Sequence, residues 1–338
     1  MRKKNWVIQV FIYLFLLVWV FFSMLPLFWT VLSSIKVPID AFSRVPKIFN
    51  FTPTGDNYAK LWLKGPSEDF LPFGIGILVI LVFLAILAAN AERVSPGRRR
   101  SKAGPYLLVV AVVLGIIFLL PNFFMMAEFY SYFQNSIVVA LGVVSISITI
   151  GCLAGYGLAR YAGVLGVIIL VVALAFRALP GSAFVLPYFY LGRLSGLYDT
   201  YFLLIVALVA VNQPFTIWLL RSFFMEIPRE IEEAAMIDGA GRLQAFVRVI
   251  IPIMWPGIIT TALFSLLLAY SDFFFALMLT LTRWTLPVGI VQFTGGEDPG
   301  YVTVAAAASV SISIPIIFVI IFFQKYLIKG LGAGAVKG

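Results

Sequence analysis

The chain has 338 residues, of which 62% are hydrophobic and 12% are charged, and its mean hydropathy is +1.04. Soluble domains carry about twice that share of charge, because polar residues must cover their surface, so a soluble enzyme, a disordered chain and a nucleic-acid-binding protein are disfavoured. The net charge is +9, and no His is present. The absence of His excludes histidine metal sites and histidine acid–base catalysis. The single cysteine, Cys152, excludes an internal disulfide and cysteine-cluster metal sites.

Apolar segments long enough, or nearly long enough, to cross a membrane as helices recur along the whole chain. Such a helix needs about 20 largely apolar residues, because the hydrocarbon core is about 30 Å thick and each residue rises about 1.5 Å. We interpret the second and third segments, which are short, as ordinary spans rather than a re-entrant pair. The eight predicted spans are 6–32, 73–90, 106–121, 133–157, 164–190, 201–221, 253–279 and 304–327.

Positive charges predict the orientation of these spans. Arg2, Lys3 and Lys4 precede a first apolar run that is longer than a signal-peptide core and ends without a small-residue cleavage site, which predicts an uncleaved anchor with a cytoplasmic N-terminus. Eight spans then place most Lys and Arg residues, including those of the basic turn 91–105, on the cytoplasmic side. We expect that turn to contact anionic membrane lipid.

Segment 222–252 is the one long, well-punctuated cytoplasmic loop. Pro228 suits the first turn of a helix, acidic residues follow it in the early turns, and Gly239 is placed to end the helix. A second amphipathic stretch follows, with apolar residues at helical spacing: Leu243, Phe246, Val247 and Ile250. The pattern predicts a helix–turn–helix element.

The first of these two helices has the features of a docking helix. Ala234 and Ala235 permit close approach to another surface, and Glu233 beside them supplies a charge to pair. A helix that only lies on the bilayer would have a basic polar face, whereas this one is acidic. Docking into the groove of a partner protein is therefore favoured.

The stretch Glu233–Ala240, EAAMIDGA, followed by Val249-x-Ile251-Pro252, closely resembles the signature loop of ABC importer permeases, E-A-A-x-x-D-G-A followed by I-x-L-P. Further segments resemble the carbohydrate-uptake branch of that family, and the tail resembles the C-terminus of the second permease of maltose-type importers. These segments are Asn135-Ser136, residues 154–160 (AGYGLAR), Pro214-Phe215-x-x-Trp218, Ile227-Pro228 and residues 330–338. The resemblance covers residues 6–60 and 128–338.

The resemblance implies an all-α polytopic protein of the plasma (inner) membrane of a prokaryote. Its fold would be the type I ABC importer permease fold, with six core helices, an inserted helical pair that makes eight spans, and cytoplasmic N- and C-termini. The corresponding organisation is an anchor helix and external loop (1–69), the inserted pair (70–122), the permease core (128–327) with its coupling loop, and a cytoplasmic tail (328–338).

The resemblance further implies a permease subunit of an ATP-driven importer for sugars of the maltose or oligosaccharide type. The chain lacks G-x-x-x-x-G-K-[ST], so we expect ATP-Mg to be used by a separate ATPase dimer. The resemblance implies no catalytic site, bound cofactor or metal in this chain. The other expected partners are a second permease and an extracytoplasmic solute-binding protein. The implied ATPase-coupling residues are Glu233, Ala234, Ala235, Asp238 and Gly239.

Polar residues within predicted spans are candidates for the translocation path, since such groups are costly in a membrane. These candidates are Arg177, Asn212, Gln213 and Asp272. Structural alternatives are a pairing of Arg177 with Asp272, and an amide that satisfies backbone groups freed by Pro214. Two outer loops, 191–200 and 280–303, are candidates for contact with the binding protein, or are ordinary turns. In the second loop the candidate residues are Gly295, Gly296, Glu297 and Asp298.

Three alternatives stay open. The same kind of permease could carry another solute, such as a polyol or a glycerophosphodiester. A stand-alone secondary transporter would need an intramembrane coupling-ion site, for which Arg177 and Asp272 are the clearly placed groups, and it would leave segment 222–252 unexplained. A membrane enzyme would need paired carboxylates, a metal set or an activated nucleophile, and no such motif is found.

Overall fold

The computed structural model describes residues 6–64, 112–122, 124–161, 163–294 and 299–335, and within these ranges the regular secondary structure is helical apart from one isolated bridge between Leu63 and Met126. Contacts divide the chain into two units, residues 1–130 with 290–312 and residues 131–289 with 313–338. The α-helices are α1 (Trp6–Ser34), α2 (Pro38–Ala41), α3 (Asp56–Trp62), α6 (Glu128–Arg160), α7 (Val164–Phe176), α8 (Gly181–Leu194), α9 (Tyr201–Glu226), α10 (Arg229–Ile237), α11 (Arg242–Ala245), α12 (Ile251–Ile253), α13 (Trp255–Tyr270), α14 (Phe274–Leu279), α15 (Leu286–Gly289) and α16 (Pro299–Ala335).

In the first unit, a hydrogen-bonded asparagine secures the chain that follows α1. The Asn57 amide donates to the carbonyl oxygens of Ser34 and Lys36, at 2.8 Å each, and its own oxygen accepts a 3.0 Å hydrogen bond from Thr303. The Lys36 side chain is buried, with its ammonium 4.7 Å from the centroid of the Trp29 ring. These contacts order the polar segment after α1, whereas α1 itself exposes apolar side chains along most of its length, as expected of a helix that faces lipid.

The second unit is built on α6 and α9, which approach each other closely. A Cβ atom at Gly151 of α6 would lie 2.8 Å from Leu220 Cδ1, so a side chain at this position would force Leu220 to shift. Gly142 lies equally close to α9, since its Cβ would lie 2.6 Å from Ile205 Cδ1. Helices α8 and α14 cover the other part of α9, and their shared core contains Val139, Val143, Val185, Leu203, Leu204, Ala207, Leu208, Ala276 and Leu279.

Among the described residues, four helices are long and apolar enough to cross a membrane as continuous spans, and two bent helix pairs meet the same test together. The four helices are Ile8–Ser34, Glu128–Arg160, Tyr201–Glu226 and Gly300–Leu327. The predicted segments 6–32, 133–157, 201–221 and 304–327 therefore have continuous helical counterparts. The second predicted segment and residues 106–111 of the third lie outside the described residues. The count of eight spans and the inserted pair consequently stay predictions.

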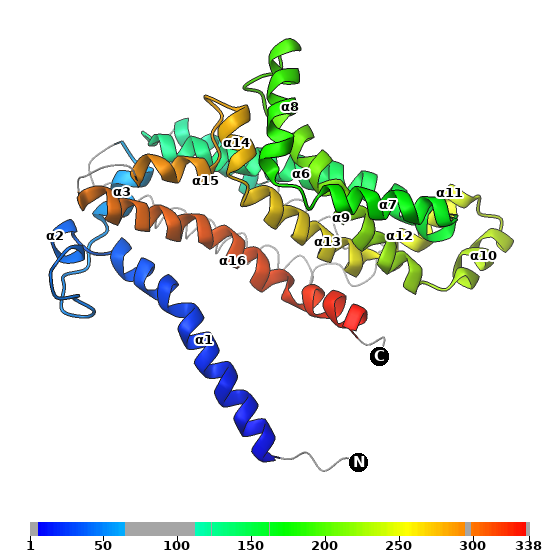
Figure 1. Ribbon diagram of the computed structural model, residues 1–338, viewed down its shortest axis with the longest axis horizontal. Coiled ribbons are helices and arrows are strands. Elements are labelled where there is room, and N and C mark those ends of the chain that lie inside the picture. Colours follow the sequence, from blue (N-terminus) through cyan, green and yellow to red (C-terminus); the bar gives the residue numbers. More distant parts are fainter. Residues whose placement is uncertain (1–5, 65–111, 123, 162, 295–298, 336–338) are drawn as a thin grey trace. The chain divides into compact units, whose positions relative to one another are not determined.

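The predicted spans 164–190 and 253–279 are not continuous helices. Helices α7 and α8 meet at 93°, a bend that is visible in Figure 1, because Pro180 disfavours helical geometry in the residue before it and α8 begins only after that proline. Helix α13 ends at Tyr270, and α14 starts as a separate helix at Phe274. A second bend, of 76°, joins Arg242–Ile253 to Trp255–Tyr270.

Candidate functional site

The predicted docking helix forms as α10, and it ends in the turn that the sequence indicates. Pro228 lies at the N-cap, one residue before the first helical turn rather than within it. At the other end Gly239 has φ +88°, a left-handed conformation that L side chains avoid. Its N–H donates to the Met236 carbonyl, and the Ala240 N–H donates to the Ala235 carbonyl, both at 3.0 Å. This pair of bonds is the Schellman motif, which satisfies the last carbonyls of a helix.

One face of α10 is open to solvent and contains most of the predicted coupling residues. Glu233, Ala234, Asp238 and Gly239 are exposed, whereas Ala235 is only partly exposed. Ile237 is also 86% exposed. A charged group, a small side chain and a large apolar side chain thus share an unoccupied helical surface that has the composition of a protein-docking site.

The opposite face of α10 is attached to α6 by a buried ion pair that the sequence analysis missed. The Arg160 Nε donates to Glu232 Oε2 at 3.0 Å, and the two side chains are 6% and 7% exposed. The Tyr156 hydroxyl donates to the other carboxylate oxygen of Glu232. A signal was present in the sequence, because Glu232 lies on the same helical face as Ile231 and Ala235, where an acid needs a partner.

The second amphipathic stretch is helical throughout Arg242–Ile253, as predicted, but it is not a regular α-helix. It consists of α11, a π-helical turn at Phe246–Ile250, and α12. Phe246 and Ile250 are buried, but Leu243 and Val247 are 70% and 53% exposed. The wider π-helical turn changes the direction in which successive side chains point, so α-helical spacing no longer defines one buried face.

The buried residues of this stretch belong to an apolar cluster at the junction of α6, α9 and α13, which we call the junction cluster. Its members are Cys152, Leu220, Phe224, Ile227, Phe246, Ile250, Met254 and Ile258. The Tyr156 ring packs on it, with its centroid 4.5 Å from that of Phe246 and 5.6 Å from that of Phe224. Helix α10 therefore lies next to a well-packed apolar cluster.

The polar candidates for the translocation path are separated rather than gathered. Arg177 caps the end of α7, with its guanidinium carbon 4.7 Å from the centroid of the Phe215 ring. Asp272 Oδ1 accepts hydrogen bonds from the backbone N–H groups of Phe275 (3.0 Å) and Ala276 (3.3 Å) at the start of α14. No ion pair joins Arg177 to Asp272 in the part of the chain that the structure describes, so the proposed pairing of these two residues is wrong.

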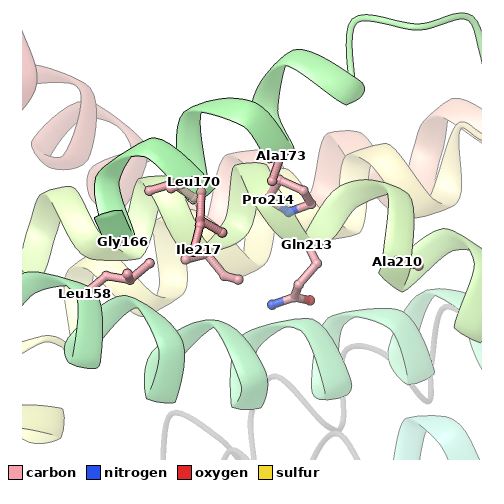
Figure 2. Close-up of a pocket in the computed structure, with 9 residues that line it drawn as sticks. Leu158, Gly166, Leu170, Ala173, Ala210, Gln213, Pro214 and Ile217 are labelled. Atoms are coloured by element: carbon pink, nitrogen blue, oxygen red, sulfur yellow. The ribbon is translucent and has the colours of Figure 1, made fainter. Parts of the chain in front are cut away.

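Gln213 lines a cavity of about 260 Å³ between α7 and α9, beside Pro214 (Figure 2). Its amide nitrogen donates to the Ser147 carbonyl at 3.1 Å, while its amide oxygen and the Ser147 hydroxyl are buried without a hydrogen-bond partner. Asn212 is buried and does not line this cavity. The other lining residues are apolar: Leu158, Gly166, Ile169, Leu170, Ala173, Ala210, Pro214 and Ile217.

Of the two loops predicted to meet a binding protein, residues 295–298 lie outside the described residues, and loop 191–200 is held by Asp199. The Asp199 carboxylate accepts hydrogen bonds from the Leu281 N–H (2.8 Å) and from the Thr282 N–H and hydroxyl (3.0 and 2.7 Å). Partial burial raises the pKa of this carboxyl, but the hydrogen bonds outweigh that effect and lower the pKa below its ordinary value. The loop is thereby fixed to the chain after α14.

Three comparisons identify the relatives of this chain. Residues 147–332 match the family model described as binding-protein-dependent transport system inner membrane component. The trehalose/maltose transport system permease protein MalG of Thermococcus litoralis is 37% identical over 62% of this chain and 77% of its own length. The trehalose transport system permease protein SugB of Mycobacterium tuberculosis is 38% identical, over 62% and 78% of the two chains.

A solved structure has the same fold. It is that of a bacterial ABC transporter involved in the import of the acidic polysaccharide alginate, with a TM-score of 0.62, 18% identity, and coverage of 96% of this chain and 98% of that chain. At that identity the likeness shows the fold alone, which is the type I ABC importer permease fold. Taken with the family match, it confirms the predicted resemblance. The chain is a multi-pass membrane protein that belongs to the family of binding-protein-dependent transport system inner membrane components.

Proposed function

We propose that the chain is a permease subunit of an ATP-driven importer of sugars of the maltose or oligosaccharide type, and that it couples to a separate ATPase subunit through α10. The relatives named for trehalose, maltose and maltodextrin transport support the choice of solute. The single observation that carries the coupling role is the geometry of α10. Its exposed face carries the acid and the small residue of the signature loop, and its buried face is attached to α6.

In this proposal α10 acts as a rigid lever. ATP binding closes the ATPase dimer, and the permease then shifts from an inward-facing to an outward-facing state because the two states differ in affinity for the closed ATPase. Glu233 pairs with a cation of the ATPase, and Ala234 and Ala235 permit close contact. Asp238 and Gly239 form the turn that ends the lever.

The remaining parts of the importer come from other chains. A second permease forms the other half of the path, an extracytoplasmic solute-binding protein delivers the sugar to an outer face that includes residues 295–298, and ATP-Mg is used by the ATPase dimer. The proposal also includes the organisation expected from the sequence, namely an anchor, an inserted pair at 70–122, a core and a tail, with both termini in the cytoplasm. Among the four path candidates, Gln213 has the best support, because its buried amide oxygen is unpartnered beside a cavity.

The test is a purification with a charge reversal and a matched control. The chain is purified in mild detergent from cells that also produce its ATPase and second permease, and uptake of labelled maltose or trehalose is measured in proteoliposomes. We expect Glu233→Lys to lose the ATPase subunit and ATP-driven uptake, whereas Glu230→Lys, an exposed acid on the same helix, retains both. Uptake by the wild-type chain alone, without ATP, would instead establish a stand-alone transporter.

A further inference from the structure

The attachment of α10 to α6 suggests how movement reaches the membrane. We propose that Glu232, Arg160 and Tyr156 form the joint through which a displacement of α10 is passed to α6, so that these three side chains determine how much transport each ATP drives. The inference rests on the proposed function, and it concerns residues on the face of α10 opposite the docking surface.

Arg160 is the last residue of α6, and one guanidinium holds two parts of the loop. Its Nε donates to Glu232 Oε2 at 3.0 Å, and its Nη2 donates to the Ile227 carbonyl at 3.1 Å. The first bond attaches α10 itself, and the second attaches the backbone that enters α10. The end of α6 is therefore tied to α10 on both sides of Pro228.

The Glu232 carboxylate is held at both oxygens by side chains from the same helix. Arg160 occupies Oε2, and Tyr156, one turn earlier in α6, occupies Oε1. Two bonds from one helix restrict rotation of α10 as well as its distance from α6, which is what a joint that transmits direction requires.

The ion pair of the joint is buried and its tyrosine packs on the junction cluster, whereas other hydrogen bonds between the end of α6 and the loop are exposed. The Tyr156 ring packs on Phe246 of the junction cluster, so the hydroxyl cannot follow Glu232 without moving that cluster. Two further hydrogen bonds run from Arg229 to the Arg160 carbonyl (3.3 Å) and from Arg242 to the Tyr161 hydroxyl (3.4 Å), and both are exposed and long. Charge-assisted bonds away from water are the stronger ones.

The joint acts on α6, a helix that is long and apolar enough to cross the bilayer. Helix α6 has 33 residues and is therefore about 50 Å long. It packs closely on α9 at Gly151, so its displacement is not absorbed by a loose contact. A force applied to α10 by the ATPase thus enters a long, packed helix at its end.

The experiment measures the ratio of sugar taken up to ATP hydrolysed in proteoliposomes that contain the full complex. For Glu232→Gln, we expect the ATPase subunit to copurify and ATP hydrolysis to persist, while the ratio falls on the order of tenfold, a typical size for coupling between sites. Glu230→Gln is the control and should keep the wild-type ratio. The double variant E232Q/R160Q should be impaired less than the product of the two single effects, because the pair acts as a unit.

Each result decides the proposal. A wild-type ratio in Glu232→Gln overturns it. Loss of the ATPase subunit from that variant also overturns it, since Glu232 would then only shape the docking surface. If Glu232→Gln fails to fold, Tyr156→Phe keeps the ion pair and the ring, and it should lower the ratio less strongly; an unchanged ratio there overturns the joint. Failure of the proposed function is seen separately, as a wild-type chain that takes up sugar without ATP.

Discussion

Replacement of Gly239 by valine tests the turn that ends α10. The glycine has φ +88°, and a Cβ atom there would meet nothing within 4 Å, so the cost of a side chain is conformational rather than steric crowding by neighbours. A left-handed non-glycine residue costs roughly 1–2 kcal/mol, and a β-branched residue lies at the upper end of that range. About 2 kcal/mol lowers the equilibrium constant for forming the native turn about 30-fold.

Gly241 offers a matched control only two residues away. A Cβ atom there also meets nothing within 4 Å, but its φ of −67° and ψ of 160° suit any residue. We expect Gly239→Val to lose most ATP-driven uptake, and Gly241→Val to stay close to the wild type. Both variants are assayed at equal expression for ATPase copurification and labelled-sugar uptake. Equal uptake by the two variants would refute the reasoning that the left-handed turn is required for coupling.

Three further predictions concern stability in detergent, followed by thermal or chemical unfolding. Glu232→Ala should lower the free energy of unfolding by about 3–5 kcal/mol because it leaves a buried guanidinium unpaired. The exposed control Glu230→Ala should lower it by less than about 1 kcal/mol. Similar losses in the two variants would contradict the ion-pair argument. Gly155→Ala should lower the free energy of unfolding by about 1–3 kcal/mol because its Cβ would lie 3.0 Å from a backbone nitrogen of α9. Gly157→Ala, on the same helix with open space around it, should be neutral or stabilising by about 0.5–1 kcal/mol. The reverse order of stability would refute the close approach of α6 and α9 at Gly155. Asp199 has a folded pKa below its ordinary 3.8, so its stabilisation is fully present above that value and is lost as the pH falls through the folded pKa. The stability difference between the wild type and Asp199→Asn should therefore shrink on acidification below about pH 4, and a difference that does not change with pH would contradict it.

Much of the fold could be predicted because hydrophobic length is a local property. The apolar runs that became α1, α6, α9 and α16 are each long enough to cross a bilayer by composition alone. The breaks in the other two spans are harder to see. Pro180 marks the first, but a proline inside α9 at Pro214 leaves that helix continuous, so the residue type does not decide the outcome.

The docking helix illustrates the same division within one short segment. Its start, its acidic first turn and its terminal glycine could be predicted because capping depends on neighbours in sequence. The attachment of α10 to α6 could not be predicted from the sequence. Glu232 and Arg160 are 72 residues apart, and which of the neighbouring glutamates turns inward depends on how α10 packs on α6.

The sequence by itself determined a helical membrane protein, its family, and the position of an exposed element ending at Gly239, because hydropathy, helix capping and the signature loop are all local patterns. Only the tertiary structure decided that Glu232 rather than Glu233 faces inward, that Arg177 lies on Phe215 while Asp272 caps α14, and that Gln213 lines a cavity. The physical reason is that buried polar groups must find partners, and the available partners are brought together by packing between helices distant in the chain.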